Sequence, residues 1–205
     1  MHTFIQYSII LISLFFWFYI DNKKIFEKNI KNSSLIHAII CSIGIHIGYF
    51  CNPLIIYNYI IVPELYDIYI IVPLITFGYS LYDLYIGIKS QKPDELIHGI
   101  LFVTCNFHSF FNDNILLSYT FLITETSTIF LNLRVYRDHR IDVLFALTFF
   151  IYRIMAAPIL SIIYLSDVNN EGWLFGCITG TCVTILNLYW FRLIVKKALK
   201  KENSE

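Results

Sequence analysis

Two ionisable residues with the chemistry of a catalytic pair flank one short polar connection in an apolar sequence. Asp83 precedes the connection formed by residues 89–94, and His98 follows it. In helices that rise 1.5 Å per residue, each lies about 9 Å from this connection and therefore at one depth. A carboxylate that orients an imidazole prepares a histidine to act as a general base or nucleophile. We therefore predict that Asp83 and His98 hydrogen-bond and are catalytic.

A second set of polar residues surrounds the stretch LITETSTIFLNLRVY, residues 122–136. Glu125 lies about 13 Å from the end of its apolar stretch, and Arg153 about 20 Å along the next one. An ionised side chain facing lipid at such a depth costs at least about 2.5–3.5 kcal/mol, so we predict that Glu125 and Arg153 pair inside the protein. The pair either holds a polar headgroup or only fixes the register of two helices.

Helical spacing indicates which polar residues share that interior. Thr128 and Asn132 fall on the face of Glu125, Tyr79 falls on the face of Asp83, and Asp142 aligns with Arg153. The predicted cavity and substrate-binding residues are Tyr79, Glu125, Thr128, Asn132 and Arg153. His46 lies in GIHIG, where the glycines at positions 44 and 48 predict close helix packing.

The elements that position these residues are predicted to be membrane-spanning helices. Of the 205 residues, 57% are hydrophobic and 15% are charged, and the mean hydropathy is +0.63, which is typical of polytopic membrane proteins. A window of about 19 residues gives seven apolar segments, 3–20, 34–51, 67–88, 95–111, 115–133, 141–165 and 173–195. Residues 54–62 are too short to span and are expected at the interface. Pro73 and Pro158 are expected to kink their helices.

The basic residues predict the orientation. Every Lys and Arg except Arg153 follows the first, third, fifth or seventh segment. The positive-inside rule then places the C-terminus in the cytoplasm and the N-terminus in the lumen or outside the cell. Trp17 and Trp190 fall at predicted membrane interfaces.

Composition and motifs exclude several classes of function. The net charge of +0 argues against a nucleic-acid partner. The five cysteines lack the spacing of a metal site, and no glycine-rich phosphate loop or G-x-S-x-G motif occurs. We therefore expect no metal and no cofactor.

The residues quoted above resemble the TLC domain, which ceramide synthases, TRAM-type translocation factors and small lipid-homeostasis proteins share. The likeness rests on YSLYDLYIGI, the histidine that follows it, ETSTIFLNLR and the buried arginine, within residues 35–196. It implies an all-α fold, with a six-helix barrel around a lipid-accessible cavity and one extra N-terminal helix. The chain then divides into an N-terminal helix and linker (1–33), a TLC-like membrane domain (34–196) and a basic tail (197–205). The resemblance also implies the endoplasmic reticulum or a related endomembrane.

The sequence departs from the ceramide synthase pattern in one respect that bears on catalysis. The adjacent histidines of those enzymes correspond here to His98 and Gly99, and no H-D-x-x-D follows Arg134. The resemblance leaves two functions open. One is a histidine-dependent acyltransferase of sphingolipid or phospholipid metabolism, with acyl-CoA as co-substrate. The other is a non-catalytic lipid-binding protein or regulator of membrane composition. Membrane lipids are the expected partners, and the oligomeric state is left open. A seven-helix receptor fits the span count alone, and the TLC-like residues argue against it.

Overall fold

A computed structural model of the chain describes residues 3–23, 25–26, 31–52, 66–111, 118–119, 121–165 and 173–202. The described part is all-helical, as predicted. Its elements are α1 (Thr3–Asn22), α2 (Asn32–Cys51), α4 (Tyr66–Ser90), α5 (Pro93–Phe111), η2 (Leu122–Glu125), α7 (Thr126–Leu133), η3 (Arg134–Tyr136), α8 (His139–Phe149), η4 (Phe150–Ala156), α9 (Ala157–Leu165) and α10 (Trp173–Glu202). The segment 54–62 lies outside the described residues.

Five helices of the described part are long and apolar enough to cross a membrane. They cover Phe4–Asn22, Asn32–Cys51, Ile68–Ser90, His139–Leu160 and Cys177–Lys197. The chain is therefore a polytopic helical protein, but the predicted count of seven spans is not confirmed. The segment 95–111 coincides with α5, whose acidic first turn, histidines and asparagine lower its hydropathy. The segment 115–133 is described only in part.

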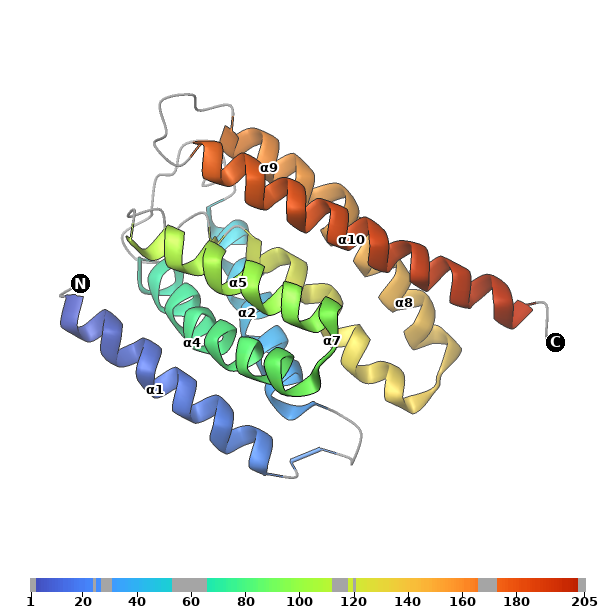
Figure 1. Ribbon diagram of the computed structural model, residues 1–205, viewed down its shortest axis with the longest axis horizontal. Coiled ribbons are helices and arrows are strands. Elements are labelled where there is room, and N and C mark those ends of the chain that lie inside the picture. Colours follow the sequence, from blue (N-terminus) through green and yellow to red (C-terminus); the bar gives the residue numbers. More distant parts are fainter. Residues whose placement is uncertain are drawn as a thin grey trace.

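Helices α1, α4 and α5 pack side by side, and α10 runs along α8 and α9 (Figure 1). Glycines allow the close approach of α4 to its two neighbours. A Cβ atom added at Gly78 of α4 would lie 2.6 Å from the carbonyl oxygen of Ile10 in α1. One added at Gly99 of α5 would lie 2.8 Å from the Cα atom of Leu84 in α4. Larger side chains at either position would force the helices apart.

Helix α1 is fixed to α4 by a buried tryptophan. The Trp17 side chain is completely buried, and its Nε1 atom donates to the Ser13 hydroxyl at 2.9 Å. That hydroxyl donates in turn to the carbonyl oxygen of Ile75 in α4 at 2.8 Å. The indole N–H therefore has its partner inside the protein, while the position of Trp17 at a membrane interface stays a prediction.

The two prolines within the spans are accommodated differently. Helix α4 continues through Pro73 as one element from Tyr66 to Ser90. Pro158 follows the π-helix η4, whose wider turns carry Arg153. Because a proline lacks an N–H group, it removes one α-helical hydrogen bond from the turn before it. Single π-turns of this kind often occur at functional sites.

Candidate lipid site in the helix bundle

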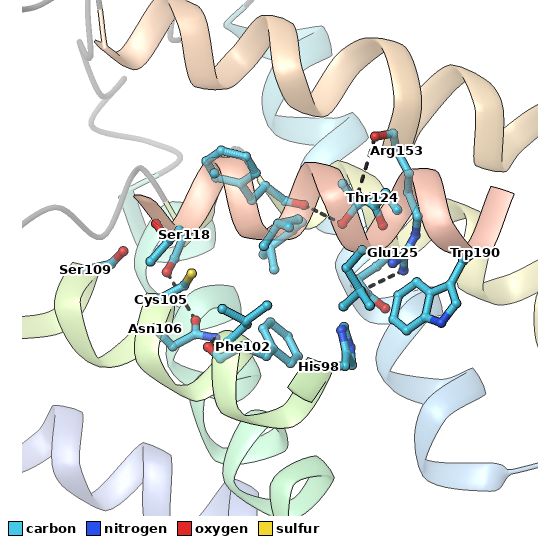
Figure 2. A pocket seen from close by; sticks show the side chains of 18 of the residues that line it. His98, Phe102, Cys105, Asn106, Ser109, Ser118, Thr124, Glu125, Arg153 and Trp190 are labelled. Atoms are coloured by element: carbon cyan, nitrogen blue, oxygen red, sulfur yellow. Dashed lines mark hydrogen bonds and ion pairs between the residues drawn. The ribbon is translucent and has the colours of Figure 1, made fainter. Parts of the chain in front are cut away.

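Two adjacent cavities lie between α4, α5, η2, α7, η4 and α10. The larger, which we call the vestibule, has a volume of about 530 Å³, and the smaller, the inner chamber, has about 120 Å³. Both are lined by His98, Phe102, Glu125, Arg153 and Trp190, so these side chains form the junction between them. Figure 2 shows His98, Glu125, Arg153 and Trp190 gathered at this junction.

The vestibule brings together every site residue that the sequence predicted. Its lining includes Tyr79, Asp83, His98, Glu125, Thr128, Asn132 and Arg153. Trp190 also lines it, although the sequence placed this residue at a membrane interface. The predicted grouping of residues from four separate apolar segments therefore describes one cavity, while the roles of these residues remain predictions.

Arg153 is held by oxygen atoms of three side chains. Its Nε atom donates to the Ser127 hydroxyl at 2.8 Å, and its Nη2 atom donates to the Thr128 hydroxyl at 2.9 Å. The Nη2 atom also lies 3.5 Å from Oε1 of Glu125, which confirms the predicted ion pair. The guanidinium lies over the Phe149 ring, 5.5 Å from its centroid. This arrangement fixes the cation at the junction of the two cavities.

Glu125 lies between two basic groups, Arg153, which the sequence pattern indicated, and His37, which it did not. Its Oε2 atom is 3.9 Å from Nδ1 of His37, which is completely buried. The imidazole stacks on the Tyr79 ring with centroids 3.8 Å apart, and the edge of Trp17 packs against it at 5.7 Å. One feature of the sequence pointed to His37, because Cys41 follows it by one helical turn and the two therefore share a helix face. In the structure both side chains are buried. Helix α1 thus supports the site through Trp17 and His37.

Asp83 and His98 are neighbours, but the predicted hydrogen bond between them is not formed. The Oδ2 atom of Asp83 lies 3.8 Å from Nε2 of His98, a distance for an ion pair and too long for a hydrogen bond. Both side chains are half-buried. The imidazole packs against the rings of Phe102 and Trp190, with centroids 5.7 and 5.4 Å away.

Gly99 does not face the cavities. It packs against the backbone of α4 at Leu84, and it is absent from the lining of either cavity. A histidine at position 99 therefore could not join His98 without separating α4 from α5. The site has one imidazole at the cavity surface on α5 that can reach a substrate.

Polar contacts at the vestibule mouth differ in part from those predicted. Asp142 accepts from Nε of Arg134 at 2.6 Å, so its predicted alignment with Arg153 is wrong. The π-helix between these residues changes the helical phase from which that alignment was calculated. Asn132 donates from Nδ2 to the Ser34 hydroxyl at 3.0 Å and ties α7 to α2.

Lysines and acids also meet at this mouth. The Nζ atom of Lys92 donates to Oε1 of Glu95 at 2.8 Å, and this hydrogen bond raises the pKa of Lys92. Lys31 lies 4.0 Å from the same oxygen. This part of the vestibule therefore carries both signs of charge.

His46 lies outside the site, as the packing interpretation of GIHIG implies. It is exposed, and its Nε2 atom lies 3.3 Å from the Tyr152 hydroxyl. Gly44, two residues before His46 in the motif, does permit close packing. A Cβ atom added at Gly44 would lie 3.0 Å from Cγ2 of Val72.

The family model for the TLC domain matches residues 28–196 of the chain. The chain belongs to the TLC-domain family. The match covers α2 through most of α10 and leaves α1 outside. Membership and the five apolar helices together fit an integral membrane protein with a lipid-related function. No curated protein and no solved structure matches the chain.

Proposed function

We propose that this TLC-domain protein binds a membrane lipid with its polar head in the vestibule and its hydrocarbon in the inner chamber. The single observation that carries the proposal is the difference in character between two cavities that share part of their walls. Asp83, Asp94 and Arg134 line the vestibule alone, whereas Leu101, Val183 and Leu186 line the inner chamber alone. An amphiphilic molecule matches such a site, because a few polar groups orient it while apolar walls bury the rest.

The proposal includes an arrangement in the membrane. Seven spans, six of them in a barrel around the cavity, would leave the N-terminus in the lumen and the C-terminus in the cytoplasm. The basic residues that follow alternate segments support this orientation. The vestibule mouth then opens to the cytoplasm near Lys31, Lys92 and Arg134 of an endoplasmic reticulum protein.

We further propose that the bound lipid undergoes acyl transfer. His98 accepts a proton from a hydroxyl or amine of the acceptor lipid while that group attacks the carbonyl carbon of an acyl-CoA thioester. The bond from carbon to sulfur breaks, an ester or amide forms, and the departing thiolate takes up the proton from His98. Asp83 stabilises the transient imidazolium, and Arg153 is near enough to hold polar head atoms.

A non-catalytic lipid-binding protein is the second candidate, and two observations favour it. The 3.8 Å separation leaves His98 without a hydrogen bond to Asp83. The packing of Gly99 on Leu84 also denies the site a second imidazole from α5. In this case the same residues bind a lipid that is never modified, and the cavity serves to sense or present it.

Purified protein separates these two candidates. It would be incubated with labelled acyl-CoA and with sphingoid-base, lysophospholipid or glycerol acceptors, and its co-purified lipids would be identified by mass spectrometry. Acyl transfer predicts a labelled product that His98→Ala abolishes. The matched control is His46→Ala, because His46 is exposed and absent from either cavity lining. Bound lipid without turnover would select the second candidate, and neither product nor bound lipid would refute both.

A further inference from the structure

Polar residues also occur at the far end of the inner chamber, where the proposed function needs only apolar walls. Asn106, Ser109 and Ser118 line this end and are buried. Figure 2 shows them together with Cys105, on the opposite side of the chamber from the charged junction. Buried polar side chains are costly in such a place unless they hydrogen-bond.

Two of these three side chains have partners, and one has none. The Ser118 hydroxyl donates to Oδ1 of Asn106 at 3.1 Å, and Nδ2 of Asn106 donates to the carbonyl oxygen of Phe102 at 2.9 Å. The Ser109 side chain is 1% exposed, and its hydroxyl has no hydrogen-bond partner among the described residues. An unsatisfied buried hydroxyl in a cavity wall points to a ligand atom that would satisfy it.

The hydrogen-bonding capacity that remains defines the chemistry of that ligand atom. Ser109 can donate and accept, while Ser118 has used its proton on Asn106 and can only accept. A group that serves both serines must accept from one and donate to the other. A hydroxyl does so, whereas a methyl group does neither and a carbonyl only accepts.

The position of the serines defines where on the lipid this hydroxyl lies. His98 and Ser109 both line the chamber from α5, and their separation along the helix is about 16 Å at 1.5 Å per residue. The hydrocarbon core of a bilayer is about 30 Å thick, so one leaflet, and hence one lipid chain, is about 15 Å long. The two polar ends of the chamber are therefore separated by about the length of one chain.

We propose that Asn106, Ser109 and Ser118 form a second polar subsite, which binds a hydroxyl group at or near the end of the lipid's hydrocarbon chain. This inference rests on the proposed function, because it assumes that the head of the same lipid lies at the Arg153 junction. It goes beyond that function by specifying the ligand class as a hydroxylated single chain. An ordered water molecule on Ser109 is the competing explanation.

The test compares two single-chain probes that differ only in the terminal hydroxyl, palmitic acid and ω-hydroxypalmitic acid. Their dissociation constants would be measured on the full-length protein in detergent or nanodiscs. One well-formed hydrogen bond corresponds to a preference of up to about tenfold for the hydroxylated acid. In Ser109→Ala the preference should fall to about one, with palmitic acid still bound. The matched control is Ser8→Ala, because Ser8 lies on α1, lines neither cavity, and donates to the carbonyl oxygen of Phe4 in its own helix.

The outcomes separate failure of this inference from failure of the proposed function. Equal binding of the two acids by the unaltered protein would refute the subsite, while the lipid cavity stands. An undiminished preference in Ser109→Ala would also refute it. Binding of neither acid would refute the inference together with the lipid cavity on which it depends.

Discussion

Removing the carboxylate of Glu125 tests whether the charged junction holds the bundle together. Glu125→Ala leaves Arg153 buried with 10% of its side chain exposed and without its counter-charge. Truncating one partner of a buried ion pair typically costs about 3–5 kcal/mol. Arg153 keeps its hydrogen bonds to Ser127 and Thr128, so we expect the lower end, about 3 kcal/mol. For a chain of this size that corresponds to a fall in melting temperature of about 6–12 °C.

The assay is thermal unfolding in detergent with matched variants. Glu125→Gln should be milder, because it keeps the shape and a side-chain oxygen that faces Arg153. Glu95→Ala is the control, since Glu95 pairs with the largely exposed Lys92 and should lose at most about 1 kcal/mol. The double change Glu125→Leu with Arg153→Met should recover stability if the pair is structural. It should recover stability but not lipid-dependent activity if the pair also holds a headgroup. An unchanged melting temperature for Glu125→Ala would refute the reasoning.

Three further predictions concern packing and topology. Gly99→Ala should destabilise the protein by about 1–3 kcal/mol, because the added Cβ atom would meet the backbone of Leu84. Thermal unfolding in detergent measures this, and an unchanged melting temperature would show that α4 and α5 can separate there. Trp17→Ala should lower the free energy of unfolding by about 3–5 kcal/mol in the same assay, and Trp17→Phe should lower it by less. An effect no larger than that of a substitution at an exposed α1 residue would show that α1 is only loosely attached. The native cysteines would be replaced, and single cysteines would be introduced at Lys92 and Arg137. Both should react with impermeant reagents from the cytoplasmic side only. Labelling of the two positions from opposite sides would refute the assigned topology.

The cost of charge in an apolar setting made the charged part of the site predictable. A charged side chain at membrane depth requires a partner, and Glu125 and Arg153 lie at similar depths in separate segments. Their pairing could therefore be predicted. Asp83 and His98 came close for a different reason, since the short connection between their helices limits their separation. The same reasoning about polar faces placed Thr128 and Asn132 at the vestibule.

Other parts of the site depend on packing that the sequence pattern does not encode. His37 is a single histidine within an apolar stretch of the sequence. Its place beside Glu125 depends on how α2 packs against η2 and α4. The π-helix at Arg153 changes the helical phase between Asp142 and Arg153, and Asp142 pairs with Arg134 instead. Of the two spans that were not confirmed, 95–111 carries polar residues that lower the hydropathy by which a span is recognised, and 115–133 is described only in part.

Photocrosslinking with a diazirine-bearing fatty acid tests most directly whether lipid occupies the cavity. The probe would be added to the protein in nanodiscs, irradiated, and its adducts located by mass spectrometry. The account predicts adducts on cavity residues such as Phe102 and Trp190, reduced by excess palmitic acid. Adducts confined to outward-facing side chains such as Phe4 and Phe50, with none in the cavity, would contradict it.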